Sequence, residues 1–165
     1  MPLFVYDADN VKPKRISEGV GVSLVETDAN VSFQLTGTYQ TAGTWTPTIT
    51  QGVGVTGTIN LATYRITGKI CTVHVHITIL SPGTSGQQIV IGGQPAIIQP
   101  ANETLAGVSM IFDSGVGFYV GIIRVVGGTD WRFYHHSSSS AMGGSPSFGL
   151  VNPDSVAFSG TYAIP

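Results

Sequence analysis

Charged residues and cysteine are scarce in this sequence of 165 residues. Asp, Glu, Lys and Arg together make up 10% of it, whereas about 25% is usual for a globular protein. Because the formal net charge is −2 and the pI is near 6.0, the chain has no general attraction for nucleic acid or for an anionic membrane surface. Its one cysteine, Cys71, excludes an internal disulfide framework.

Long apolar runs and enzyme motifs are also missing. No apolar run approaches the roughly 18 residues of a membrane span, and the first residues do not form a basic segment leading into an apolar one, so neither a span nor a signal peptide is expected. The chain has no G-x-S-x-G motif, and its G-x-G strings lack a βαβ context. The carboxylates of the second half are scattered and form no recognisable acid/base pair: Glu103, Asp113, Asp130 and Asp154. We therefore expect a protein that is not an enzyme and holds no cofactor.

Alternation of apolar and polar residues is clearest between Tyr64 and Leu80. From Cys71 to Ile79 every second residue is apolar, with threonine and histidine between, which predicts a strand with one buried and one solvated face. Gly68-Lys69 is the expected turn to a preceding strand. Cys71 falls on the buried face and is interpreted as a small inert hydrophobe.

Short strands of this kind recur along the chain. A first hairpin is expected from Val20 to Leu35, and the last strand around Phe158; between 95 and 104 there is room for at most one helical turn, near residues 101–105. About ten short strands, frequent glycine turns and no helical periodicity predict an all-β protein, an antiparallel sandwich or jelly roll. The expected division is an N-terminal arm and hairpin (1–42) followed by a sandwich knob (43–165).

Four motifs in the second part resemble a known module. They are GTWTPTIT (Gly43–Thr50), a Tyr-x-x-x-Gly hairpin (Tyr64–Gly68), IVIGGQPA (Ile89–Ala96) and FSGTYAI (Phe158–Ile164). Together they resemble the β-sandwich head at the C-terminal ends of tail fibres and tailspikes of tailed bacteriophages, over about three-quarters of the chain. The resemblance implies a homotrimer without enzymatic activity, used for trimerisation or glycan contact.

The chain departs from that family because only some 40 residues precede the module, with no shaft. A short arm and hairpin before a knob is more similar to a capsid decoration or cement protein. The expected function is thus a homotrimeric structural protein on the virion surface that binds the phage major capsid protein. The alternative is a tail protein whose head contacts host surface glycans; a free carbohydrate-binding module is a third reading. The low charge favours a surface covered by copies of the chain or by a larger assembly, although a neutral Ser/Thr surface in water has the same composition.

Three groups of residues are candidates for sites. Lys12, Lys14 and Arg15 are candidate docking residues for a capsid or tail protein, or belong to a solvated basic tail. Tyr134, His135 and His136 are candidate glycan contacts beside a serine-rich loop, since aromatic rings stack on sugars. By alternation, Trp131 is expected in the core instead.

His74 and His76 form an H-x-H pair on the solvated face of the central strand. Such pairs from three chains that meet on an axis can ligate one iron ion, an arrangement that resembles some phage fibre tips. Two histidines alternating with threonine are also ordinary outward-facing polar residues. We therefore expect no metal here, with this pair as the one alternative.

Overall fold

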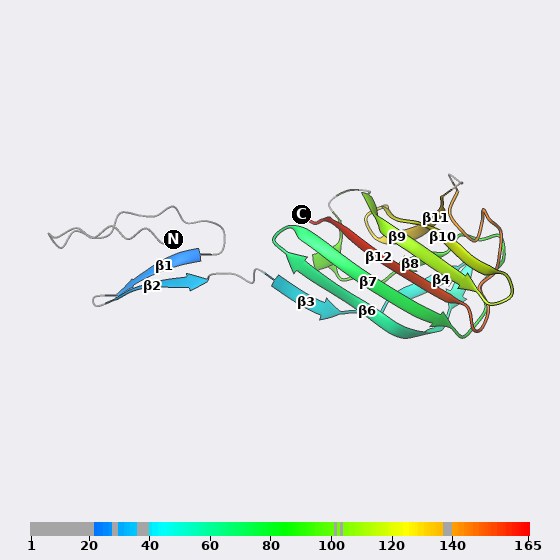
Figure 1. Ribbon diagram of the computed structural model, residues 1–165, viewed down its shortest axis with the longest axis horizontal. Helices are drawn as coiled ribbons and strands as arrows, with labels where there is room; N and C mark the ends of the chain where they lie inside the picture. The colour runs from blue at the N-terminus through cyan, green and yellow to red at the C-terminus, as the bar shows by residue number, and fades with distance from the viewer. Residues whose placement is uncertain (1–21, 28–29, 36–39, 101, 103, 137–139) are drawn as a thin grey trace. The chain divides into compact units, whose positions relative to one another are not determined.

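The computed structural model describes residues 22–27, 30–35, 40–100, 102, 104–136 and 140–165. The chain forms two compact units, Met1–Tyr39 and Gln40–Pro165. In the first unit, β1 (Val22–Thr27) and β2 (Asn30–Leu35) pair in an antiparallel hairpin, as expected (Figure 1). Residues 40–42 pair with a strand of the second unit, so its sheet begins slightly before the boundary expected at residue 43.

The second unit is one antiparallel sheet of ten strands. In order across the sheet these are β3 (Gln40–Thr44), β6 (Gly57–Thr67), β7 (Ile70–Ile79), β12 (Ser155–Ala163), β9 (Thr104–Asp113), β10 (Gly117–Val126), β11 (Asp130–His135), β8 (Val90–Gly92), β4 (Thr48–Gln51) and β5 (Val53–Val55). Every pairing within it is antiparallel. No α-helix occurs among the described residues, and none of their helical segments has the length and hydropathy to span a bilayer. The expected all-β, antiparallel class is confirmed.

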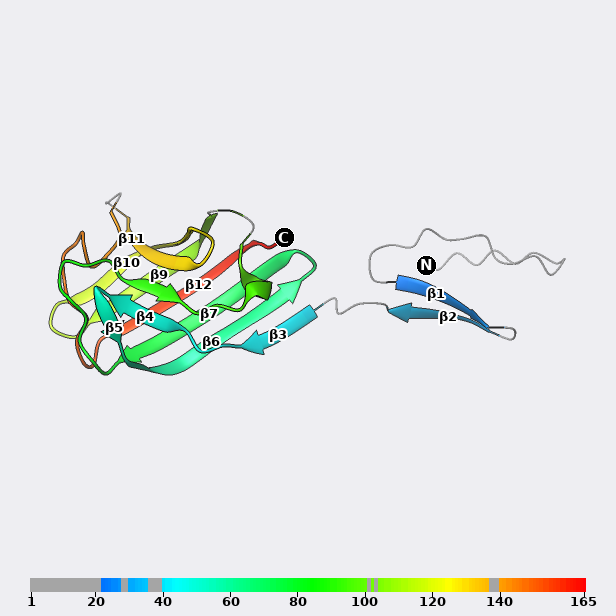
Figure 2. The same ribbon diagram turned by 180° about the vertical axis from the view of Figure 1, so that it is seen from behind.

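The sheet curls into a sandwich-like fold. Figures 1 and 2 show that β4, β5, β8 and β11 lie against one side of the longer strands. Trp131 and Phe133 on β11 pack against Phe158 on β12, with ring centroids 5.0 and 5.9 Å apart, and Trp131 also meets the edge of Tyr162. These aromatic contacts join the two layers across the core, which places Trp131 inside the protein as predicted.

The hairpin of β6 and β7 matches its sequence pattern. The five alternate residues from Cys71 to Ile79 are each at most 2% exposed, because a period of two directs all of them to the inner side. Gly68 has a φ of +61° in the turn, a conformation that glycine adopts without strain. Cys71 is a buried free thiol, also as predicted.

The segment before β9 differs from the expectation of a helical turn near residues 101–105. The helical turn is a 3-10 helix at Ala96–Ile98, and β9 already begins at Thr104. Ile98 is fully buried and its carbonyl accepts a hydrogen bond from the Tyr162 hydroxyl, so the turn is fixed where it meets the core. Pairing of Thr104 with Val125 of β10 then draws the following residues into the sheet.

Candidate functional site

The side of β6, β7, β12, β9 and β10 that faces away from the core is here called the outer face. Strand registers align its residues in rows: Leu61, His76, Ala157, Met110 and Val120 lie opposite one another in one row. The next row contains Thr63, His74, Ser159, Val108 and Ile122. Both rows therefore run from mixed polar and apolar residues on β6 and β7 to apolar residues on β9 and β10.

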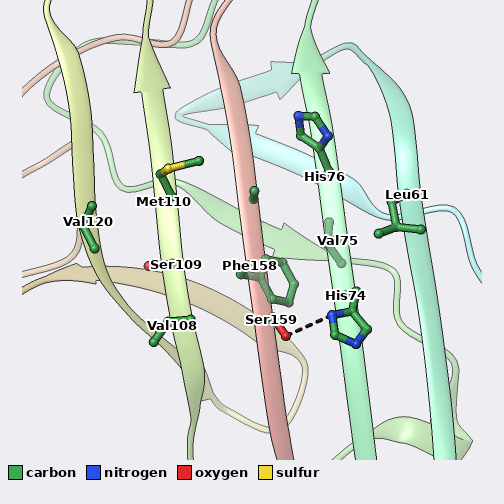
Figure 3. A pocket seen from close by; sticks show the side chains of 11 residues that line it. Leu61, His74, Val75, His76, Val108, Ser109, Met110, Val120, Phe158 and Ser159 are labelled. Carbon is green, nitrogen blue, oxygen red and sulfur yellow. Dashed lines mark hydrogen bonds between the residues drawn. The ribbon is translucent and has the colours of Figure 1, made fainter.

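A shallow groove runs along this face above β12. Its volume is about 490 Å³, and it is lined by side chains that include Leu61, His74, His76, Val108 and Met110. Ala157 and Ser159 of β12 are small, so they leave a depression between the larger side chains of β7 and β9. Figure 3 shows Ser159 between His74 of β7 and Val108 of β9. The groove is thus formed by the order of small and large residues across the sheet.

A ridge of apolar side chains lies beside the groove on β9 and β10. Its members are 39–65% exposed: Val108, Met110, Phe118, Val120 and Ile122. The Phe118 ring packs against that of Phe112, with centroids 5.0 Å apart. Because large contiguous apolar patches are uncommon on soluble monomers, this ridge is the feature of the surface that most calls for a partner.

Charge is almost absent from the outer face. Among the described outward-facing residues of its five strands, the charged ones are Arg65 and Arg124, and none is acidic. The buried carboxylate of Asp154 lies elsewhere, where its oxygens accept hydrogen bonds from the backbone N–H groups of Ser114 and Val151. The described residues of the face therefore include no carboxylate that could act as a general acid or base.

The histidine pair of the central strand lies on the groove wall. Both side chains are exposed, and His74 Nδ1 shares a hydrogen bond of 2.9 Å with the Ser159 hydroxyl of β12 (Figure 3). The described residues contain no cluster of three or more His, Cys, Asp or Glu side chains within one chain that would hold a metal. His74 and His76 line the groove. Metal binding by several copies stays the alternative to the expectation of no metal.

The three candidate glycan contacts lie together at the end of β11. Tyr134 and His135 are half-buried and His136 is exposed, and the two imidazole rings have centroids 4.1 Å apart. Tyr134 also forms an isolated bridge with Ala141, which connects this strand end to the following loop. The aromatic cluster is partly accessible, but its use in glycan binding stays a prediction. Lys12, Lys14 and Arg15 lie outside the described residues.

The buried side chain of Gln51 has a structural role in the second unit. Gln51 is fully buried: its side-chain oxygen accepts from the Leu150 N–H at 2.8 Å, and its amide donates to the carbonyls of Phe148 and Gln87 at 2.7 and 3.1 Å. It therefore ties two loops to β4. The sequence pattern did not indicate this role, because a lone glutamine between threonine and glycine resembles any turn residue.

Cys71 and Tyr162 form a buried pair. Burial raises the pKa of the Tyr162 phenol well above its ordinary value, and the neighbouring Cys71 thiol raises it further. Burial likewise raises the pKa of the Cys71 thiol, while a hydrogen bond with Tyr162 acts in the opposite direction. A thiol held in its neutral form is a weak nucleophile, so this pair contributes to packing.

The outer-face ridge is the functional candidate that sequence reasoning missed. Its signal was present in GFYVGIIRVV, the sequence of β10, where apolar residues occupy both faces of the strand and not only alternate positions. A continuous apolar strand is typical of a strand buried on both sides. Here one side meets the core and the other is exposed.

Comparison of the chain with models of protein families, with curated proteins and with solved structures finds no match. The likeness to tail-fibre heads therefore stays a resemblance of motifs.

Proposed function

We propose that this chain is a non-enzymatic structural protein on the surface of a tailed-phage virion, most specifically a homotrimeric capsid decoration protein anchored by its N-terminal arm. The observation that carries the proposal is the apolar ridge on an almost uncharged outer face. The unit that contains it, Gln40–Pro165, has four basic and four acidic residues, so its formal net charge is zero. Such a surface suits permanent burial in an assembly better than solvation as a monomer.

The mechanism of decoration would be mechanical. The knob trimerises, and the arm with Lys12, Lys14 and Arg15 pairs with acidic groups of the major capsid protein, which steers docking. Apolar surface buried between knob, arm and shell contributes about 25 cal/mol per Å² and holds neighbouring capsid subunits together.

The alternative is a tail-located head that binds host glycans. The observation that favours it is the partly accessible cluster of Tyr134, His135 and His136. Partly exposed aromatic rings offer apolar faces with polar edges to a sugar.

Counting copies per virion against the major capsid protein by quantitative mass spectrometry tests the proposal. Hundreds of copies are expected for a decoration protein, whereas a few to a few dozen would place the protein on the tail and overturn the capsid assignment.

A second experiment uses a chain that lacks residues 1–18 and the triple variant Lys12→Glu/Lys14→Glu/Arg15→Glu. Both are expected to lose binding to undecorated capsids, with the full chain carrying Lys69→Glu, a turn lysine of the knob, as the control. Full capsid binding by both arm variants would contradict anchoring through the arm.

A further inference from the structure

The two halves of the outer face differ in shape. Over β7 and β12 it is a groove with Ala157 and Ser159 as its floor. Over β9 and β10 it is a ridge that includes Phe118, and the ridge residues Val108, Met110 and Val120 also form a wall of the groove. We infer that the outer face is the surface through which copies of this chain meet, with the ridge of one copy seated in the groove of the next. This inference rests on the proposed homotrimer and assigns its interface.

The size of the face fits a protein partner. Its five strands contain nine to eleven residues each. With a rise of about 3.3 Å per residue and about 4.8 Å between strands, they cover roughly 800 Å². In a head-to-tail ring each copy divides this area between two contacts, so the area covered per copy, summed over both contacts, equals the approximately 800 Å² per partner of a standard protein interface. A small ligand would occupy only part of such an area.

The chemistry of the face favours a second copy over a different, oppositely charged protein. The described residues of the face include no carboxylate, and its two arginines are outside the rows of Val120 and Val108. Contact between two copies in these rows therefore brings no like charges together and needs no opposite charge from outside. The apolar sequence of β10 on both faces agrees, because such strands are typically covered on both sides.

The arrangement of groove and ridge is compatible with two kinds of symmetry. A twofold axis seats the ridge and the groove of two copies in each other at once, whereas head-to-tail contacts close into a ring when the rotation allows it, and the proposed trimer uses the ring. A three-membered ring places the three outer faces around a common axis, which covers the ridge of every copy.

The test compares two valines of similar exposure in the full chain. Val120, on the ridge, is 56% exposed, and Val53, on the distant edge strand β5, is 53% exposed. Val120→Glu is expected to weaken self-association on the order of 100-fold or more, because it places an unpaired carboxylate in an apolar contact. Val53→Glu is expected to leave self-association unchanged. Sedimentation equilibrium gives the association constants, and circular dichroism verifies that both variants fold.

The outcomes separate this inference from the proposed trimer. A wild-type chain that stays monomeric at high micromolar concentration overturns both. A wild-type trimer that persists in Val120→Glu and in a second ridge variant, Val108→Glu, overturns the interface and leaves trimerisation intact.

Cysteine cross-linking tests the head-to-tail geometry. Val120 and Ala157 lie in one row with Met110 between them, about 9–10 Å apart, too far for a disulfide within one chain. The double variant Val120→Cys/Ala157→Cys is expected to give covalent trimers under mild oxidation, and each single variant is not. The native Cys71 is present in every variant, and because it is fully buried it is not expected to form cross-links. Absence of intermolecular cross-links in the double variant, or equal cross-linking in a single one, contradicts the ridge-in-groove contact.

Discussion

The two faces of the same five strands differ in how their side chains are covered. On the inner side, Phe158 and its neighbours meet the aromatic residues of β11, and nearly every side chain is fully buried. On the outer side, Phe118 and Val108 are each 65% exposed although they are as apolar as the core. The comparison teaches that apolar composition alone does not mark the core of this protein. The inner face is already covered within one chain, whereas the ridge of the outer face is exposed among the residues that the structure describes.

The largest expected effect comes from a matched pair of phenylalanines. Phe158→Ala on the inner face is expected to lower the free energy of unfolding by about 3–5 kcal/mol, because it leaves a cavity between the layers. Phe118→Ala on the outer face is expected to change the stability of the monomer by less than about 1 kcal/mol, since its ring is mostly exposed. Urea unfolding of both variants measures this at a concentration where the chain is monomeric. Equal losses would mean that the two faces are equally packed within one chain.

An intermediate effect is expected for the buried tyrosine on the inner side of β12. Tyr162→Phe leaves the Ile98 carbonyl without its hydrogen bond, which is expected to cost about 1–2 kcal/mol at neutral pH. The same variant tests how the stability of the protein depends on alkaline pH. Because the folded state raises the pKa of Tyr162 and of Cys71, both groups keep their protons when folded but lose them when unfolded above about pH 9.

The contribution of these two groups to the free energy of unfolding is therefore expected to be fully present below about pH 8.5 and to fall as the pH rises further. Tyr162→Phe should lose less stability between about pH 9 and 11 than the wild type, and Cys71→Ala should remove the thiol contribution. Unfolding curves at several alkaline pH values measure the slopes. A slope unchanged in both variants would show that other groups cause the alkaline loss.

The smallest effects are expected for two serines, one on each face. Ser109 is 3% exposed on the inner side, and among the described residues its hydroxyl has no hydrogen-bond partner. Ser109→Ala is expected to stabilise the protein by about 1 kcal/mol, because the buried hydroxyl no longer needs to be desolvated.

Ser159→Ala removes the hydrogen bond to His74 on the exposed outer face and is expected to change stability by less than about 0.5 kcal/mol. Thermal unfolding of the two variants gives the difference. A loss of stability in Ser109→Ala would indicate that its hydroxyl has a partner, such as a buried water.

Much of the fold was predictable from local patterns. The alternation from Cys71 to Ile79 identified the central strand, its buried side and the buried cysteine, and the turn at Gly68 followed from the same stretch. The position of Trp131 in the core also followed from alternation. The position expected for a helical turn, near residues 101–105, was wrong, since the turn lies at Ala96–Ile98. A short irregular segment contains no period, and its conformation depends on contacts with distant strands.

The candidate site was less predictable. The histidines of the central strand were noticed as an H-x-H pair, but their neighbours Ala157 and Met110 are separated from them in sequence by about 81 and 34 residues and become adjacent only when β12 pairs between β7 and β9. The groove exists because small residues of the last strand enter the middle of the sheet. Nothing in the local sequence of that strand indicates which strands pair with it.

The sequence by itself determined the all-β class and, for strands in which apolar and polar residues alternate, the buried side, because these depend on a period of two between near neighbours. It did not determine the buried side of β10, which is apolar on both faces. The tertiary structure alone decided the strand order, and with it which residues lie in one row of the outer face. That order arises from pairings between strands more than 30 residues apart, such as β12 with β9. Long-range pairing is selected by the packing of the whole core and leaves no periodic trace in either strand.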